Sequence, residues 1–275
     1  MNPRLILKVL IVLMLFPALI CLFLPGTIAN SYTKIMHPLA LLIGGLLSLR
    51  VASIYKNWLR KMFIFLSLFL FFMMLVNIDP LVELLRAVFG NQFPLFVLIM
   101  QWTTYTMLVL CSLYALKVTE LRKLGMEGWI AIMAVSVLGV VIVTYPSVLQ
   151  QMIGVHNAGI YTISLLLIRL TDVAIVIMLV PVVVLYAKQK RLEGRESITF
   201  TTIICGIILS LTAVYVYEIV FDVPLYVVAQ AVYHTGSILD ALYLFSYLII
   251  AAGLYVHKKY DEWGFDMIEQ ALLGG

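Results

Sequence analysis

The chain has 275 residues, of which 64% are hydrophobic and only 12% are charged, and its mean hydropathy is +1.09. Soluble domains carry roughly a quarter charged residues, so this composition excludes an ordinary soluble protein and indicates a chain embedded in a membrane. Its three cysteines all lie within apolar segments, which argues against both a disulfide framework and a zinc site.

Apolar segments of transmembrane length follow one another along the chain. A membrane-spanning helix needs about 20 mostly apolar residues, and hydropathy predicts eight such helices. We expect the first to be retained, because its apolar run exceeds the roughly 7–15 residues of a signal-peptide core. The predicted spans are 5–24, 38–55, 61–78, 94–116, 129–145, 160–186, 199–220 and 237–256.

These spans predict an all-α, polytopic membrane helix bundle over residues 1–260, without a separate soluble domain. Residues 261–275 form a predicted short amphipathic cytoplasmic tail, in which Trp263, Phe265 and Ile268 can share one helix face. Within the bundle, the pair Gly44 and Gly45 predicts a close approach of the second helix to a neighbour.

The distribution of basic residues predicts the orientation of the bundle. With the N-terminus inside, the outer connections hold only Lys34 and Arg86. Positive residues favour the cytoplasmic side, so we expect a multi-pass protein of the cell membrane with cytoplasmic N- and C-termini. The inner segments hold Arg4, Lys8, Lys56, Arg60, Lys61, Lys117, Arg122, Lys123, Lys188, Lys190, Arg191, Arg195, Lys258 and Lys259.

A recurring pattern marks three of the outer connections. A proline stands ten residues before a histidine in the pairs Pro146–His156 and Pro224–His234, whereas a third copy places Gly90 after Pro80. Proline suits the first turn of a helix, so each copy predicts a short helix along the outer surface. His156 and His234 are then either interfacial residues at turns or ligand- or proton-sensing groups in an outward vestibule.

Ionisable residues inside the sixth span are a second candidate feature. Charges within a membrane span are costly and are functional candidates by default. Arg169 and Asp172 lie three residues apart and therefore on one helix face. They form either a structural ion pair, or an anchor for a polar ligand, or part of a proton path.

Polar side chains concentrate in the outer halves of the fourth, sixth, seventh and eighth spans, while the inner halves are nearly all aliphatic or aromatic. This asymmetry favours a polar pocket that opens outward and is closed toward the cytoplasm. The candidate ligand-binding residues are Gln101, His156, Arg169, Asp172, Glu218, His234, Asp240 and Tyr243.

The sequence lacks the motifs of common enzyme and cofactor sites. No Walker A loop, GxSxG or HExxH motif occurs. The sequence also lacks the pair of Asp-rich motifs with which membrane transferases bind a Mg²⁺-diphosphate group. We therefore expect no catalytic set, metal or cofactor, and an enzyme is the least favoured class. The expected partners are the lipid bilayer, a cytoplasmic signalling protein or subunits of a membrane complex. Nucleic acid is not expected, because the net charge of +4 comes from the inner connections and reports orientation.

The last span, TGSILDALYLFSYLIIAAGLY (235–255), resembles the closing helix of the polytopic membrane sensory input regions, with seven or eight helices, of prokaryotic signalling proteins. The matching positions are Gly236, Asp240, Tyr243, Tyr247 and Gly253. The resemblance implies a sensory module. Since no kinase or cyclase sequence follows residue 260, it also implies either a separate output polypeptide or a fragment of a longer protein.

The leading hypothesis is thus a membrane sensor or receptor-like module with an outward-facing polar pocket and no output domain of its own. One alternative is a small-solute or proton-coupled transporter in which Asp172 and Asp240 titrate. The other is a membrane scaffold or accessory subunit whose polar residues pack against partner helices.

Overall fold

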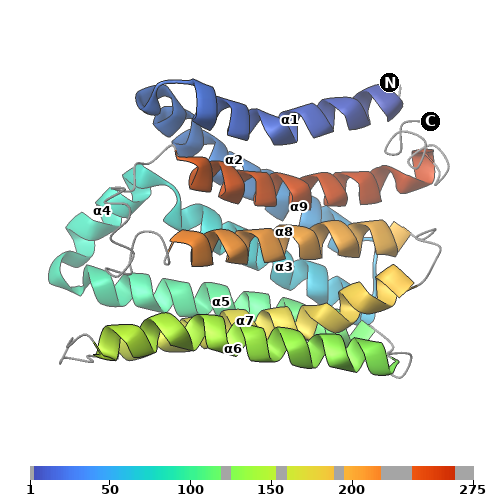
Figure 1. The fold of residues 1–275 in the computed structure, drawn as a ribbon. Coiled ribbons are helices and arrows are strands. Elements are labelled where there is room, and N and C mark those ends of the chain that lie inside the picture. Colours follow the sequence, from blue (N-terminus) through green and yellow to red (C-terminus); the bar gives the residue numbers. More distant parts are fainter. Residues whose placement is uncertain (1–2, 119–124, 153–159, 189–194, 218–236, 264–275) are drawn as a thin grey trace.

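The computed structural model describes residues 3–118, 125–152, 160–188, 195–217 and 237–263, and all regular structure in these ranges is helical (Figure 1). The helices are α1 (Pro3–Phe23), α2 (Gly26–Ala52), α3 (Asn57–Val76), α4 (Asp79–Phe89), the single 3₁₀ turn η1 (Gly90–Gln92), α5 (Phe93–Val118), α6 (Met126–Met152), α7 (Ile160–Lys188), α8 (Arg195–Tyr217) and α9 (Ile238–Trp263).

The helices are compatible with a multi-pass membrane protein. Four segments of the described chain are long and apolar enough to cross a membrane: Gly26–Ala52, Asn57–Val76, Asp79–Val118 and Ile238–Tyr260. Shorter apolar segments lie in α1, α6, α7 and α8. The all-helical class is therefore confirmed, whereas a full set of eight spans stays a prediction.

The long helices run back and forth between two ends of the bundle (Figure 1). α1 begins and α9 ends at one of them, which we call the basic end because it carries Lys56, Lys61, Lys117 and Lys258. The opposite end carries α4, and we call it the α4 end. The predicted outer half of the bundle corresponds to the α4 end.

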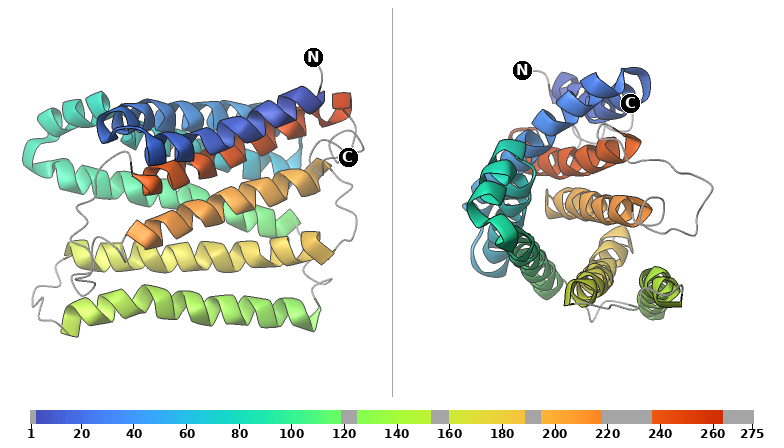
Figure 2. Two further views of the ribbon diagram at one scale, coloured as in Figure 1. Left: turned by 45° about the horizontal axis from the view of Figure 1, so that its top comes forward. Right: turned by 90° about the vertical axis from the view of Figure 1, so that its left-hand side faces the viewer.

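The core lies where α2, α3, α5, α8 and α9 meet. α9 packs against α8, α2 and α1, while α3 packs against α2 and α5. α6 contacts mainly α7 and lies at the periphery in the end-on view (Figure 2). Its apolar side chains, such as Ile130, Met133 and Val137, are accordingly exposed. The centre of the molecule is therefore the group of helices around α9.

Small and hydroxylated residues bring α2 and α3 close together, as the Gly44–Gly45 pair predicts. A Cβ atom at Gly45 would stand 2.7 Å from the Phe71 ring, so this position has room only for glycine unless the ring moves. Ser67 Oγ donates a hydrogen bond to the Gly45 carbonyl at 2.8 Å, and Ser48 Oγ donates to the Phe63 carbonyl at 2.7 Å. These contacts are typical of helix pairs in membranes.

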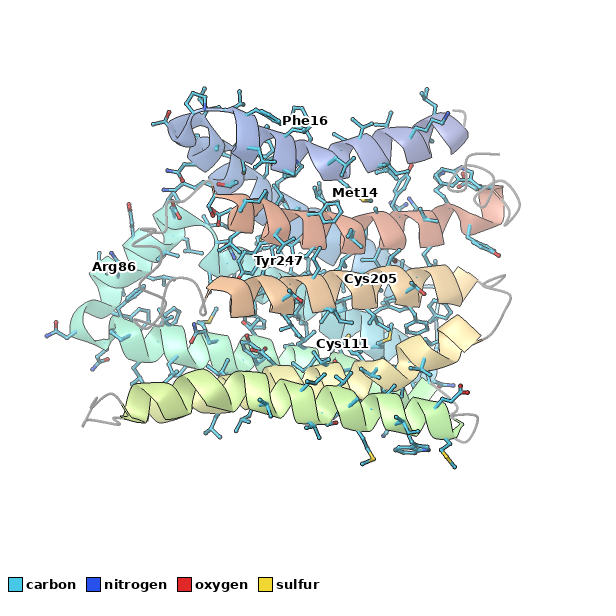
Figure 3. All side chains as sticks on the ribbon, viewed as in Figure 1. Met14, Phe16, Arg86, Cys111, Cys205 and Tyr247 are labelled. Carbon is cyan, nitrogen blue, oxygen red and sulfur yellow. The ribbon has the colours of Figure 1, made fainter. Side chains whose placement is uncertain are left out.

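All three cysteines are free, and they lie on different helices. Cys111 of α5 is buried and Cys205 of α8 is exposed (Figure 3), while Cys21 of α1 is half-buried.

Two proline positions differ from the prediction. α2 begins at Gly26 rather than at residue 38 and continues through Pro38, and α6 continues through Pro146 to Met152 instead of breaking there. Proline is tolerated inside membrane helices, where neighbouring groups satisfy the freed backbone carbonyl. The Pro224–His234 copy of the pattern lies outside the described residues.

The third copy of the proline pattern does form the predicted short helix. α4 has Pro80 in its first turn and ends at Phe89. Gly90 follows, with a φ of 50° and a ψ of −122° that only glycine adopts without strain. This backbone conformation explains why glycine, and not histidine, ends this copy.

The last helix extends beyond the last predicted span, which ends at residue 256. α9 continues as one helix to Trp263, whose ring packs edge-on against Tyr255 at 6.0 Å between centroids. The rest of the predicted amphipathic tail lies outside the described residues.

Candidate functional site

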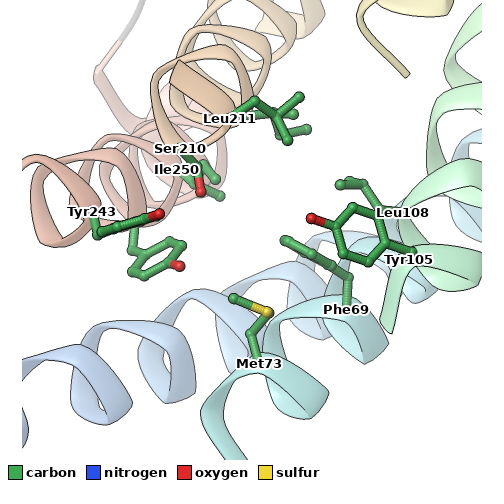
Figure 4. Close-up of a pocket in the computed structure, with 10 residues that line it drawn as sticks. Phe69, Met73, Tyr105, Leu108, Ser210, Leu211, Tyr243 and Ile250 are labelled. Atoms are coloured by element: carbon green, nitrogen blue, oxygen red, sulfur yellow. The ribbon is translucent and has the colours of Figure 1, made fainter. Parts of the chain in front are cut away.

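A small cavity of about 60 Å³ lies between α3, α5, α8 and α9 in the half of the bundle nearer the α4 end (Figure 4). Most of its wall is apolar: Phe69, Met73, Leu108, Ile207, Leu211 and Ile250. Its lining resembles that of small-molecule sites, which combine an apolar wall with a few polar groups that fix the ligand, but its volume admits only a molecule of a few heavy atoms.

Four hydroxyl groups interrupt this apolar wall. They belong to Tyr105 of α5, Ser210 of α8, and Tyr243 and Tyr247 of α9. The Tyr105, Ser210 and Tyr243 hydroxyls point toward the space between the helices (Figure 4). Tyr247 is almost fully buried and hydrogen-bonds to Ser210. We call these four residues the hydroxyl cluster.

Helical periodicity explains why the residues of the hydroxyl cluster on α9 and α5 face the same cavity. Tyr243, Tyr247 and Ile250 are spaced i, i+4 and i+7, which puts them on one face of α9. The same spacing puts Tyr105 and Leu108 on one face of α5, with Gln101 one turn nearer the α4 end. The cavity thus forms where these two faces meet α3 and α8.

His37 of α2 and Asp240 of α9 form a contact between their helices beside the cavity. The His37 ring packs edge-on against Tyr247, with 6.1 Å between ring centroids. Its Nε2–H donates a hydrogen bond to the Asp240 carbonyl oxygen at 2.9 Å, which fixes the proton on Nε2 when the ring is neutral. This contact ties the first turn of α9 to α2.

The Asp240 carboxylate caps its own helix. Its Oδ2 accepts a hydrogen bond from the Ser237 backbone N–H at 3.2 Å, an arrangement in which an acidic side chain in the first turn satisfies an orphan helix donor. Asp240 is only 7% exposed and does not line the cavity. Its Oδ2 atom therefore stabilises the start of α9.

The polar residues of α5 divide into two groups. Thr103, Thr104 and Thr106 each donate to the carbonyl four residues earlier in α5, at 2.7–2.8 Å, so their hydroxyls are satisfied locally. Gln101 is half-buried, and its buried Oε1 atom has no hydrogen-bond partner among the described residues. Gln101 is thus the α5 amide available to a ligand or water molecule.

The structure brings together only part of the predicted ligand-binding set. Tyr243 lines the cavity, and Gln101 and Asp240 lie within one turn of residues that do. Asp172 is fully buried in α7, which packs against α5. Arg169 lies three residues earlier in α7, with its side chain outside the described part. Glu218, His156 and His234 also lie outside the described residues.

Sequence reasoning missed Tyr105, Ser210 and His257. Tyr105 carries a detectable signal, because it shares a face with Gln101. Ser210 stands among apolar residues of α8, and only the helix packing shows where it points. His257 follows the last predicted span and precedes two lysines, so it reads as part of a basic turn.

His257 is instead the centre of a buried network at the basic end. It is 1% exposed, and its ring lies 5.9 Å from the Phe63 ring. Its Nδ1 hydrogen-bonds to Thr199 Oγ1 of α8 at 2.5 Å, and its Nε2 to the Tyr55 hydroxyl, between α2 and α3, at 3.0 Å. A neutral imidazole donates through one nitrogen and accepts through the other, which two hydroxyls can satisfy. We call His257, Thr199 and Tyr55 the histidine network.

Aromatic and basic side chains also meet at this end of the bundle. The Trp58 ring stacks on Tyr114 at 5.6 Å between centroids. The ammonium groups of Lys61 and Lys117 lie 4.8 Å and 4.4 Å from the centre of the Trp58 ring. Such belts of aromatic and basic residues are typical of the membrane–water interface.

No group of three His, Cys, Asp or Glu residues within the described ranges is arranged to hold a metal ion. Comparison with protein-family models, with curated proteins and with solved structures finds no match to this chain. The chemistry of the two sites is therefore the basis for assigning a function.

Proposed function

We propose that this protein is a membrane sensor module that binds a small ligand at the hydroxyl cluster and transmits the binding event along α8 and α9 to its basic end. The observation that carries the proposal is the cavity itself, which places hydroxyl groups from three helices within an apolar wall. The favoured ligand is very small, with a short apolar part and one hydrogen-bonding group, such as a short alcohol.

The route of the signal follows from the packing of α8 against α9. Both helices contribute to the cavity, through Ser210 and Tyr247, and both contribute to the histidine network, through Thr199 and His257. Tyr247 and His257 are ten residues apart, or about 15 Å along the helix. A ligand that shifts α9 against α8 at the cavity therefore changes the Thr199–His257 contact at the other end.

The orientation predicted from the basic residues gives this route a direction. With the basic end in the cytoplasm, the cavity lies in the outer half of the membrane and the histidine network near the inner surface. Small shifts between packed helices are a known means of transmitting ligand binding. The output would then be read by a cytoplasmic protein at the basic end.

The test uses ethanol at low concentration as the probe and purified protein in lipid nanodiscs. Wild-type protein should show an ethanol-dependent rise in unfolding temperature, because a ligand that binds only the folded state stabilises it. The variants Tyr105→Phe and Ser210→Ala each remove one hydroxyl and should reduce this rise. Tyr114→Phe is the matched control, since its ring stacks at the basic end, away from the cavity. Equal responses of all four proteins, or no response from the wild type to ethanol, methanol and 1-propanol, would reject the site.

A second candidate function is proton-coupled transport, and the complete burial of Asp172 within α7 favours it. An ionisable group at such a position is a functional candidate by default. The test is proton flux into proteoliposomes that contain a pH-sensitive dye. Asp172→Asn should abolish the flux, while Asp79→Asn, at an exposed position, should not. Flux no greater than in protein-free liposomes would reject transport and leave the sensor proposal intact.

A further inference from the structure

A second, larger cavity lies at the α4 end, where α4 covers the ends of α3 and α5. Its volume is about 620 Å³, and all ten side chains that line it are hydrophobic. They include Phe72 and Val76 of α3, Leu81 and Leu85 of α4, and Phe93 and Val97 of α5. The cavity is separate from the hydroxyl cluster, because the two share no lining residue.

A space of this size and chemistry does not suit ordered water. None of its ten lining residues is fully buried, so it is a partly open groove and not a closed void. An ordered water molecule needs two to four polar partners, and this lining offers none from its side chains. An engineered apolar cavity of about 150 Å³ stays dry and binds benzene. The occupant of the larger cavity is therefore apolar.

The position of the cavity indicates which apolar molecule occupies it. α3, α4 and α5 lie in the segments Asn57–Val76 and Asp79–Val118, both of which are long and apolar enough to cross a membrane. The cavity thus borders the bilayer, where lipid acyl chains are the most abundant apolar groups. Its volume falls within the roughly 300–1,000 Å³ typical of ligand sites.

α4 also supplies a cation at the margin of the cavity. The Arg86 guanidinium lies 5.2 Å from the centre of the Phe93 ring, which lines the cavity, and Arg86 stands at the periphery of the molecule (Figure 3). At the opposite end of α4, Lys34 pairs with Asp79 at 2.7 Å. Arginine suits phosphate because its planar fork can donate two parallel hydrogen bonds.

We propose that one acyl chain of a membrane phospholipid occupies the cavity between α3, α4 and α5, with the lipid phosphate at Arg86. The bound lipid replaces the missing side-chain packing and holds α4 against the bundle. This inference depends on the membrane location of the chain and not on the proposed sensor function.

Photo-crosslinking in liposomes tests the proposal. The protein is reconstituted into phosphatidylcholine vesicles that contain a small fraction of phosphatidylcholine with a diazirine on one acyl chain. After irradiation, adducts should concentrate on cavity-lining residues between 72 and 100. Val97→Phe places a bulky ring in the cavity and narrows it, so it should lower their yield several-fold, and Arg86→Gln should lower it to a smaller extent.

Ile99→Phe is the matched control, because Ile99 lies two residues from Val97 but on the exposed side of α5. Its adduct yield should equal that of the wild type. Equal yields for Val97→Phe and Ile99→Phe, in proteins with matching helical content and elution volume, would overturn the proposal. Displacement of the lipid adducts by a low concentration of free palmitate would overturn it too, in favour of a free fatty acid as the occupant.

Discussion

The roles of the individual histidines depend on contacts that cannot be read from the sequence. The recurring proline pattern emphasises His156 and His234, yet the described histidines with specific partners are His37 and His257. His37 holds the start of α9, and His257 connects α9 to α8 and to Tyr55 between α2 and α3. Both join helices that are far apart in the sequence.

The histidine network leads to a prediction about Thr199. Thr199→Val keeps the shape of the side chain but removes the hydroxyl, leaving one nitrogen of the buried His257 ring without this partner. We expect a loss of about 1–3 kcal/mol in the free energy of unfolding, the usual cost of an unsatisfied buried polar group. Denaturant unfolding in detergent measures it.

Thr212→Val on the same helix is the control. Thr212 is exposed and its hydroxyl bonds only to the Ile208 carbonyl of α8. Its replacement should leave the free energy of unfolding close to that of the wild type. If Thr212→Val lowered the free energy of unfolding as much as Thr199→Val does, the loss in Thr199→Val would not come from the histidine network.

At the scale of elements, glycines determine how closely α8 and α9 approach. A Cβ atom at Gly253 of α9 would overlap the Thr202 side chain, and one at Gly206 of α8 would overlap Ile250. Since Ile250 lines the small cavity, the Gly206 contact also sets the position of the cavity wall. The α8–α9 interface is therefore tight along its length, which is what the proposed signal route needs.

We predict that Gly253→Ala and Gly206→Ala each destabilise the protein by about 1–3 kcal/mol, the typical cost of forcing extra atoms into a packed interface. Gly26→Ala is the control, because a Cβ atom there would meet nothing within 4 Å. This control should be neutral or slightly stabilising, since alanine favours helix. Thermal unfolding of the three variants, measured side by side, separates a tight interface from a general effect of losing glycine.

Gly90 gives a second prediction at this scale. Its positive φ ends α4, so Gly90→Ala should cost about 1–3 kcal/mol through backbone strain, although a Cβ atom there would have open space around it. Hydrogen exchange of the α4 amides, compared with those of α3, should increase in this variant. Unchanged exchange in α4 would contradict the role assigned to this turn.

At the scale of the whole molecule, the different side chains at the two ends of the bundle support its placement in a membrane. The basic end joins lysines to a tryptophan and a tyrosine, whereas the α4 end carries the Lys34–Asp79 pair and both cavities. The geometry alone does not assign either end to the cytoplasm. The positive-inside pattern of the sequence makes that assignment.

This orientation is testable with single cysteines in a background that lacks Cys21, Cys111 and Cys205. Glu83→Cys at the α4 end should react with a membrane-impermeant maleimide on intact cells, because we expect that end to face outward. Lys56→Cys at the basic end should react only after the membrane is permeabilised. Both positions are exposed in the folded protein. The reverse pattern would invert the proposed direction of the signal.

The sequence by itself determined the helical class, the approximate position of each long helix, the short α4 helix after Pro80 and the close packing at Gly44–Gly45. These features depend on local apolar runs, on proline and glycine chemistry and on the absence of charge, all of which are readable along the chain. Helix ends at Pro38 and Pro146 were predicted wrongly, because neighbouring helices can stabilise a proline inside a helix.

Only the tertiary structure decided which polar side chains share a site. Tyr105, Ser210 and Tyr243 lie on three different helices, and their common cavity depends on the rotation of each helix about its axis. The same holds for His257, which meets Thr199 across 58 residues of sequence. Apolar helices rotate to bury small residues and fill space, and this packing involves the whole bundle at once, so no single segment encodes it.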